Sequence, residues 1–450
     1  MAGGGRHYVA VIGAATSGSV AAELLAQRGI QVAVIEQNRR PYGKIEDGLP
    51  RWHAQQRRQE YALIDERLKK PGVQFVPVTK IGREVEFAKL CKDWGFSAVV
   101  LANGAWRDRD IGVPGADRFI DKGLAYQNPL IYWYNHKNEK TYDGPRYETP
   151  DETVVVGGGL ASIDVIKILQ LENYERALAA HGVHVEMHEL EKRGVPLICK
   201  ANGIEPESLG VRGCLLIYRR REQDMPLAQP PDNATPEQIA QTEKVRLKLL
   251  RLAREKFLFR VQDCTMVAGV LEENGRMVGL RTVRTKVEGR KAEPIAGTEQ
   301  ELRAPLVISS IGSVPEVLPG IAMKGEYYTF DGEEIPRYLG HEHVFGVGNV
   351  VTGQGNIRVS LVHSQKVTAH LIENYLDVGA SDGNLKPFYE AAEARAVAQT
   401  ESMMKKIATL PGLSGAEFAA VDERVKERQK AVGYEDYDSW IKKVTPEDLE

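Results

Sequence analysis

Cysteine is scarce in this chain of 450 residues, which contains four. They are widely scattered and form no Cys-x-x-Cys pair: Cys91, Cys199, Cys214 and Cys264. A chain of this length can bury a sizeable core without disulfide bonds, so we expect four reduced thiols, most of them buried. The spacing also argues against a disulfide reductase, because that activity needs a pair of neighbouring redox-active thiols.

Long hydrophobic runs and an excess of one charge are missing too. No apolar run approaches the roughly 18 residues of a membrane-spanning helix, and the first residues lack the pattern of a cleavable signal peptide. We therefore expect a cytoplasmic protein with no membrane partner. The 59 Lys and Arg residues nearly balance the 62 Asp and Glu residues, which gives no reason to expect nucleic acid binding. The length suggests two or three globular domains.

A strand, a glycine turn and a helix open the chain. The apolar run at 7–12 predicts a strand, and residues 20–28 have helical spacing. Residues 13–18, Gly-Ala-Ala-Thr-Ser-Gly, lie where a dinucleotide-binding fingerprint needs small residues for a tight turn, close approach of a pyrophosphate and helix packing. A second strand at 31–36 ends on an acid, which accepts hydrogen bonds from a ribose diol and repels a 2′-phosphate. This unit therefore suits FAD or NAD and uses Gly13, Gly18 and Glu36, with Ala15 in place of the second glycine.

The same pattern starts again near Thr153. A strand at 153–156 is followed by three glycines, 157–159, and by an apolar helix at 163–169. The next strand, at 213–218, ends in Arg219, Arg220 and Arg221 instead of an acid. Guanidinium groups match phosphate geometry, so this unit predicts NADP(H), although an exposed basic turn would have the same sequence. Two different nucleotide sites in one chain favour hydride transfer between NADPH and a flavin.

The remaining segments predict a particular fold class. We expect strands at 73–78, 98–101, 306–311 and 344–347, a helix at 232–256, a strand meander at 259–286, and a loop at 352–356 that opens a helix at 359–375. The fold is therefore expected to be α/β, with two Rossmann-like three-layer dinucleotide-binding domains, the NADPH domain inserted into the FAD domain. The predicted boundaries are 1–119 and 315–379 for the FAD domain, 120–314 for the NADPH domain, and 380–450 for a C-terminal helical extension that forms a separate appendage.

Several further motifs occur in collinear order between about Val9 and Tyr375: Pro41–Gly48 with Leu49–His53, Leu101–Ala105 with Val113–Gly115, Trp133–Asn135, Gly159–Val165 and Tyr218–Pro226. With them the chain resembles the adrenodoxin reductase and glutamate synthase small-subunit branch of the flavoproteins with two dinucleotide-binding domains. It departs from the family at Ala15 and Ser162, where many relatives have glycine, and at Asn349, where many have aspartate.

The resemblance implies a set of site residues. It places His53 and Asp164 near the flavin ring as catalytic or positioning residues, whereas His53 by itself would be an ordinary loop histidine. The implied cofactor contacts are Gly43, Lys44, Gly48, Val78, Ala102, Gly104, Gly348, Asn349, Gly355, Asn356 and Ile357 for FAD, and Gly157, Gly159, Leu160, Ala161, Arg219 and Arg220 for NADP(H). No metal site is expected, because the histidine pairs 184/188 and 341/343 lack a third ligand at a suitable spacing.

The sequence thus predicts an FAD-dependent enzyme of the ferredoxin–NADP reductase type, which passes electrons between NADPH and a ferredoxin-like iron–sulfur protein in either direction. Two alternatives stay open: an electron-input subunit of a larger complex, as in glutamate synthase, and a non-catalytic NADPH and FAD sensor. A homodimer is compatible with the sequence. Six basic residues of one helix could form a positive rim for an acidic ferredoxin, or a solvated face balanced by Glu243 and Glu255: Lys244, Arg246, Lys248, Arg251, Arg254 and Lys256.

Overall fold

Short apolar runs form the centre of the sheet in the first lobe. The computed structural model describes residues 6–230, 234–331, 337–352 and 386–446. The strand order of the first sheet is β18-β19-β20-β4-β1-β2-β3, and the strands from β20 to β3 are parallel. Parallel strands are covered on both faces and therefore need apolar residues on both sides. In β1 (Tyr8–Ile12), Val9 and Val11 belong to one core, and Tyr8, Ala10 and Ile12 to the core on the opposite face.

The other strands of this sheet are β2 (Gln31–Ile35), β3 (Val73–Val76), β4 (Ala98–Leu101), β18 (Phe330–Asp331), β19 (Arg337–Tyr338) and β20 (Val344–Gly346). One face is covered by α1 (Thr16–Gln27), α3 (Ala54–Leu68), α12 (Lys386–Ile407) and α14 (Tyr437–Val444). The other face is covered by α4 (Phe87–Lys92) and α13 (Gly415–Val432), with the short strands β16 (Met323–Lys324) and β17 (Tyr327–Tyr328).

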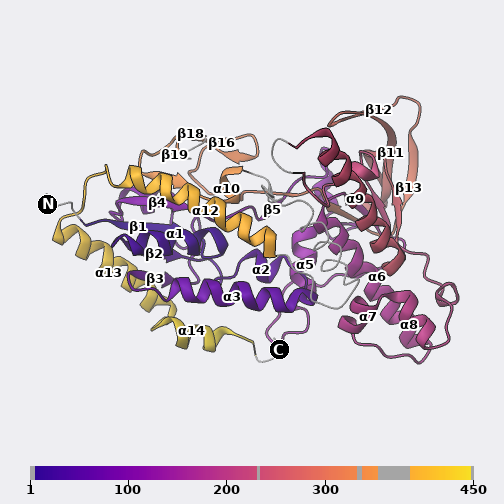
Figure 1. Cartoon of the computed structure of the whole chain (residues 1–450), viewed down its shortest axis with the longest axis horizontal. Coiled ribbons are helices and arrows are strands. Elements are labelled where there is room, and N and C mark those ends of the chain that lie inside the picture. Colours follow the sequence, from indigo (N-terminus) through magenta and orange to yellow (C-terminus); the bar gives the residue numbers. More distant parts are fainter. Residues whose placement is uncertain (1–5, 231–233, 332–336, 353–385, 447–450) are drawn as a thin grey trace.

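The second lobe, on the right of Figure 1, is built on a five-stranded parallel sheet of order β6-β14-β7-β8-β9. Its strands are β6 (Leu124–Tyr126), β7 (Val154–Gly157), β8 (Leu215–Ile217), β9 (Arg260–Gln262) and β14 (Val307–Ser310). One face carries α5 (Gln127–His136), α6 (Leu160–Ala180), α7 (Met187–Arg193), α8 (Val195–Ala201) and α9 (Pro236–Phe257). The opposite face is covered by an antiparallel sheet of β10 (Thr265–Glu273), β11 (Arg276–Glu288), β12 (Lys291–Pro294) and β13 (Gln300–Arg303).

The chain crosses between the lobes twice, and the two crossings lie side by side. The outgoing strand β5 (Arg107–Asp108) pairs antiparallel with the returning strand β15 (Ser313–Val314). The five-stranded sheet is thus inserted into the chain of the first lobe, and the α/β class with two dinucleotide-binding units is confirmed. The exact domain boundaries stay a prediction.

The C-terminal tail corrects the expectation of a separate appendage. It is helical, but Met403, Met404 and Ile407 of α12 lie in the same core as Val9 and Val11 of β1. Val421 of α13 packs into the core on the other face. Large apolar residues are few in the tail, but they recur at helical spacing, which is enough to bury one stripe of each helix. The predicted loop and helix at 353–375 lie outside the described residues.

Candidate cofactor site

The first glycine loop has the geometry that a dinucleotide fingerprint requires. Gly13 follows β1 with a φ of +97°, and a Cβ placed on it would lie 2.7 Å from the carbonyl oxygen of Ala102. A Cβ on Gly18, within α1, would lie 1.8 Å from the carbonyl oxygen of Gly13. The first glycine therefore permits the turn, and Gly18 lets the helix pack against it.

Ala15, the departure from the fingerprint, is matched by a glycine on the facing segment. A Cβ on Gly43, whose φ is +53°, would lie 2.8 Å from the Ala15 methyl carbon. Gly348, also at positive φ, faces the same loop, where an added Cβ would lie 2.2 Å from the Ser17 hydroxyl oxygen. Two glycines from distant parts of the chain thus leave room around the loop, and the Ala15 methyl needs no distortion of it.

Glu36 lies just beyond the end of β2 and is buried. Its Oε2 accepts a hydrogen bond from the Ala14 amide at 2.9 Å, and its Oε1 accepts one from the Asn38 amide at 2.9 Å. Burial raises the pKa of the carboxyl group to about 7, although these amide hydrogen bonds oppose the shift. The remaining lone pairs of the carboxylate can accept hydrogen bonds from a ribose diol.

A cavity of about 340 Å³ is lined by these groups and by residues of the second lobe. Its volume lies within the range usual for cofactor sites. Twelve of the predicted site residues line it: Gly13, Ala15, Glu36, Gly43, Lys44, Ala102, Gly104, Leu160, Ala161, Asp164, Gly348 and Asn349. Five other predicted residues do not line the cavity. They belong to the loops and turns that shape it, or they adjoin lining residues: Gly18, Gly48, Val78, Gly157 and Gly159. Gly355, Asn356 and Ile357 lie outside the described residues.

The second glycine loop is held closely by its neighbours. A Cβ on Gly157 would lie 2.3 Å from the carbonyl oxygen of Ser310, and one on Gly158 would lie 2.3 Å from the ring of Tyr218. Ser162, in place of a third glycine, donates a hydrogen bond to the Ser310 carbonyl oxygen at 2.9 Å. The small residues here are thus needed for packing, and they bring the start of α6 to the cavity wall.

The predicted 2′-phosphate arginines lie beyond the end of β8. Arg219 is exposed. Arg220 donates a hydrogen bond from Nε to the Tyr218 hydroxyl at 2.9 Å, and Arg221 forms an ion pair with Asp224 at 2.8 Å. Arg219 and Arg220 therefore present positive charge beside the second loop, while the charge of Arg221 is neutralised by its neighbour.

His53 and Asp164 come from different lobes and lie near each other. The Nε2 atom of His53 is 4.0 Å from Oδ1 of Asp164, which lines the cavity. The same Nε2 atom accepts a hydrogen bond from the indole nitrogen of Trp52 at 3.0 Å. The buried Lys167 ammonium lies over the Trp52 ring, 4.4 Å from the ring centre, and is paired with Glu191 at 2.7 Å. A ring nitrogen that accepts from an indole N–H carries no proton itself, so Nε2 is the acceptor of this hydrogen bond.

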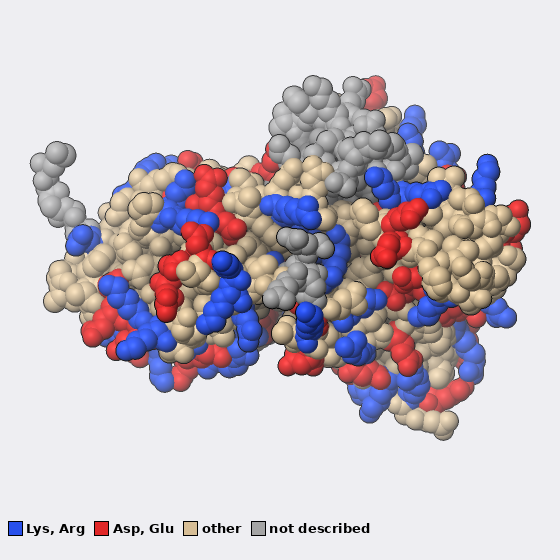
Figure 2. All heavy atoms as spheres, turned by 90° about the horizontal axis from the view of Figure 1, so that it is seen from below, with Lys and Arg blue, Asp and Glu red and all other residues tan. Residues whose placement is uncertain are grey.

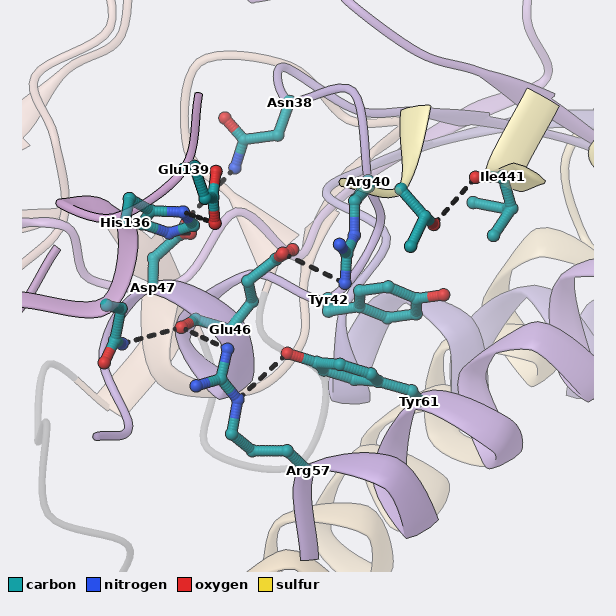
Figure 3. Close-up of polar contacts among 12 residues, drawn as sticks. Asn38, Arg40, Tyr42, Glu46, Asp47, Arg57, Tyr61, His136, Glu139 and Ile441 are labelled. Atoms are coloured by element: carbon teal, nitrogen blue, oxygen red, sulfur yellow. Dashed lines mark hydrogen bonds and ion pairs between the residues drawn. The ribbon is translucent and has the colours of Figure 1, made fainter. Parts of the chain in front are cut away.

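Figure 3 shows the buried polar cluster behind the 43–51 segment, where the two lobes are joined. The Asn135 amide of the Trp-Tyr-Asn motif donates to the carbonyl oxygens of Glu46 at 2.8 Å and Leu49 at 3.0 Å. Next to it, His136 bonds to Asp47 at 3.0 Å and to Glu139 at 2.7 Å. Burial alone would lower the pKa of His136, but these two carboxylates outweigh it and raise the pKa to about 9. The cluster therefore fixes α2 (Lys44–Asp47) against α5.

Lys44 begins α2 and lines the cavity. Its ammonium donates to Asn128 at 3.2 Å and to Ser313 at 3.0 Å, and both partners belong to the second lobe or its return strand. Burial lowers the pKa of Lys44, and the nearby Asp108 carboxylate opposes this shift. This lysine thus ties the junction together while it faces the cavity.

Some lining residues had no sequence signal. Trp106 and Lys80 adjoin predicted positions and could have been found by extending those motifs. Ala392 and Arg395, on α12, could not, because nothing local in the charged tail indicates a contact with a loop more than 370 positions earlier.

None of the four cysteines lines the cavity; all four are free, and three are buried, as expected. Within the described residues, no three His, Cys, Asp or Glu side chains gather as a metal site, and no helix is long and apolar enough to cross a membrane.

The comparisons with known proteins agree with this geometry. The family described as pyridine nucleotide-disulphide oxidoreductase matches residues 7–200. That match covers less than half of the 450 residues. Two relatives align over most of their length: the mitochondrial NADPH:adrenodoxin oxidoreductase of Arabidopsis thaliana, 23% identical over 95% of this chain and 94% of the relative, and the NADPH-ferredoxin reductase FprA of Mycobacterium leprae, 24% identical over 84% and 85%.

Among solved structures, FprA from Mycobacterium tuberculosis in complex with NADPH is similar, with a TM-score of 0.65 and 18% identity over 94% of this chain and 91% of the other. The similarity of fold therefore extends over most of the chain, beyond residue 200. The resemblance inferred from the sequence motifs is confirmed.

Proposed function

We propose that the chain is an FAD-containing oxidoreductase that takes electrons from NADPH and passes them to a ferredoxin-like iron–sulfur protein. One observation carries the proposal: the starts of α1 and α6, each following a glycine loop, line a single cavity between the lobes. A flavin bound there would supply two-electron chemistry with NADPH and one-electron chemistry with an iron–sulfur partner.

The residues present fit the two cofactors. The space around residues 13–17 is kept open by Gly43 and Gly348, and the helix N-terminus there attracts phosphate. The buried Glu36 carboxylate has lone pairs to accept the adenosine ribose hydroxyls. Arg219 and Arg220 would bind the 2′-phosphate of NADPH. Leu160 and Ala161, which line the cavity, would contact the same nucleotide.

We assign His53 and Asp164 a positional and proton-handling role. Nε2 of His53 accepts a hydrogen bond from Trp52 and lies 4.0 Å from Oδ1 of Asp164. The two side chains would position the flavin and take part in proton delivery when electrons leave singly. Alignment of the nicotinamide and flavin rings would contribute more to the rate of hydride transfer than proton handling does, because the transfer depends on the geometry of the two rings.

Both alternatives to this function, a subunit of a larger complex and a non-catalytic sensor, are less well supported than before. The relatives named NADPH:adrenodoxin oxidoreductase and NADPH-ferredoxin reductase align over nearly the whole chain, which supports a separate iron–sulfur acceptor. The sensor alternative rests on the two departures Ala15 and Asn349, and Gly43 accommodates the methyl group of the first. A cytoplasmic location and a homodimer remain predictions.

The test is anaerobic reduction followed by transfer. We expect purified protein to bind FAD, to lose its yellow colour on mixing with NADPH much faster than with NADH, and to reduce an added ferredoxin. Protein that binds both nucleotides but shows no bleaching would be a sensor, and bleaching without transfer to any ferredoxin, together with copurification of a fixed partner, would indicate a subunit of a larger complex.

A further inference from the structure

The turn that follows β8 has a fixed main chain. The Arg219 carbonyl oxygen accepts a hydrogen bond from the Thr285 hydroxyl at 2.7 Å, and the Arg220 carbonyl oxygen accepts one from the Cys264 amide at 2.9 Å. Thr285 belongs to β11, and Cys264 lies in the turn just before β10. The main chain of the arginine turn is therefore held in place, which leaves the direction of its long side chains to be set by other contacts.

Tyr218, the last residue before the arginines, is positioned by the second glycine loop. Its side chain is buried, and a Cβ on Gly158 would lie 2.3 Å from its ring. The ring also belongs to the core that α6 and α9 share. Because the ring cannot move without disturbing that packing, the Tyr218 hydroxyl has a fixed position beside the arginines.

The Tyr218 hydroxyl, Arg220 and the main chain of Asp224 bond to one another in a closed triangle. The hydroxyl accepts a hydrogen bond from Nε of Arg220 at 2.9 Å and donates one to the Asp224 carbonyl oxygen at 3.0 Å. The same carbonyl oxygen accepts a hydrogen bond from Nη2 of Arg220 at 3.2 Å. Nε and Nη2 form one edge of the planar guanidinium, so the end of the group, with Nη1, is left to meet phosphate oxygens.

The Asp224 carbonyl group is itself a fixed acceptor. The Asp224 carboxylate accepts hydrogen bonds from Nε and Nη2 of Arg221 at 2.8 and 2.9 Å. The neighbouring Gln223 carbonyl oxygen accepts one at 3.2 Å from Nη1 of Arg246, which reaches across from α9. Arg221 and Arg246 thus hold the turn against which the Arg220 side chain is oriented.

We propose that the Tyr218 hydroxyl is a positioning group that directs the Arg220 guanidinium towards the 2′-phosphate of NADPH and so helps to set the preference for NADPH over NADH. This inference rests on the proposed function, which assigns the 2′-phosphate to Arg219 and Arg220. An arginine side chain has many rotamers, and holding it in one of them costs conformational entropy. The triangle meets that cost in the free protein, so less of it opposes the binding of the phosphate.

The experiment compares two nucleotides that differ in the 2′-phosphate. Adenosine 2′,5′-bisphosphate and adenosine 5′-monophosphate are titrated into protein saturated with FAD, and binding is followed by calorimetry. In Tyr218→Phe, which keeps the ring, we expect the dissociation constant for the bisphosphate to rise about threefold to tenfold, the effect of one hydrogen bond, with that for the monophosphate unchanged. The matched control is Tyr126→Phe, which removes a hydroxyl that donates to Asp117 at 2.6 Å from β6 of the same sheet. It should change neither constant.

A double variant separates positioning from packing. Arg220→Gln alone should raise the dissociation constant for the bisphosphate. Adding Tyr218→Phe should raise it no further, because the hydroxyl then has no arginine to direct. Additive effects of the two substitutions would show that Tyr218 acts independently of Arg220, and the inference would be wrong.

The outcomes separate this inference from the function it rests on. If wild-type protein prefers the bisphosphate and Tyr218→Phe keeps the whole preference, the inference is wrong and the proposed function stands. If Tyr218→Phe weakens the binding of both nucleotides by the same factor, the hydroxyl serves the fold of the lobe, and the inference is again wrong. If wild-type protein binds the two nucleotides equally well, the assignment of NADPH to the second site fails, and the inference fails with it.

Discussion

If the adenosine ribose binds at Glu36, as proposed, the ionisation of this residue will couple to cofactor binding. Its pKa is about 7 in the buried, ligand-free site, so it is half protonated there near neutral pH. Ribose hydroxyls donate to the ionised form, so binding favours the carboxylate. We expect FAD affinity to rise as pH rises through 7, by about tenfold between pH 6 and 8, and to level off above.

Titrations of FAD at a series of pH values check this expectation. Glu36→Gln, which cannot ionise, should bind FAD more weakly and with a flat profile over the same range. An unchanged slope in that variant would assign the pH dependence to another group.

Gly43 and Ala15 lie so close together that there is no room for a methyl group on both. Gly43→Ala places a Cβ 2.8 Å from that of Ala15, at a φ of +53° that other residues rarely adopt. We expect a loss of about 1 to 3 kcal/mol in the free energy of unfolding, measured by denaturant titration, and weaker FAD binding. The double variant Ala15→Gly with Gly43→Ala should recover part of the loss, because the clash disappears while the backbone strain stays. No recovery would mean that the two residues do not compete for space.

At the scale of elements, the junction of α2 and α5 depends on a charged histidine. The pKa of His136 is about 9 in the folded protein, against about 6.5 for an unperturbed histidine. Because the folded value is the higher one, the stabilisation is fully present below about pH 6.5 and is lost as pH rises through 9. We expect roughly 3 kcal/mol to be lost across this window.

Thermal unfolding between pH 6 and 9.5 tests this assignment by comparing wild-type protein with His136→Gln. The variant should be less stable at pH 6, and the difference should shrink towards pH 9.5. A constant difference would show that His136 contributes through packing and not through its charge.

The elements that the sequence predicted are those with local signals. Six strands were each expected within a residue or two of their observed bounds: β1, β2, β4, β7, β14 and β20. They are short, largely apolar runs that end at or near a glycine, an acid or an alanine. The role of α12 was not predictable, because its contacts with α1 and Gly348 join positions far apart in the sequence. Likewise the Trp-Tyr-Asn motif was recognised only by resemblance. What Asn135 does, holding the carbonyl groups of the 43–51 segment, needs the spatial arrangement.

At the scale of the whole molecule, neither sign of charge dominates. On the face in Figure 2, Lys and Arg side chains alternate with Asp and Glu over both lobes, in keeping with the formal net charge of −3. The structure narrows the basic rim expected on α9. Arg246 is turned inward, donating to the carbonyl oxygens of Ala228 at 2.7 Å and Gln223 at 3.2 Å. Arg251 lies 3.7 Å from Glu255, and Arg254 lies 3.3 Å from Glu222.

Lys256 is half-buried, with its ammonium 5.3 Å from the centre of the Phe257 ring. Lys244 and Lys248 are exposed cations one turn apart on α9. Long-range attraction from such charges would steer an acidic ferredoxin and act on the association rate more than on affinity. Raising the ionic strength from about 0.01 M to 0.15 M shortens the Debye length from about 30 Å to 8 Å, so ferredoxin reduction should slow steeply while reduction of a small neutral dye should not. Replacing both lysines with glutamate should reproduce the effect of salt for the protein acceptor alone. If reduction of the ferredoxin and of the dye slow equally, the two lysines affect the flavin site and not docking. The docking surface would then lie on another face.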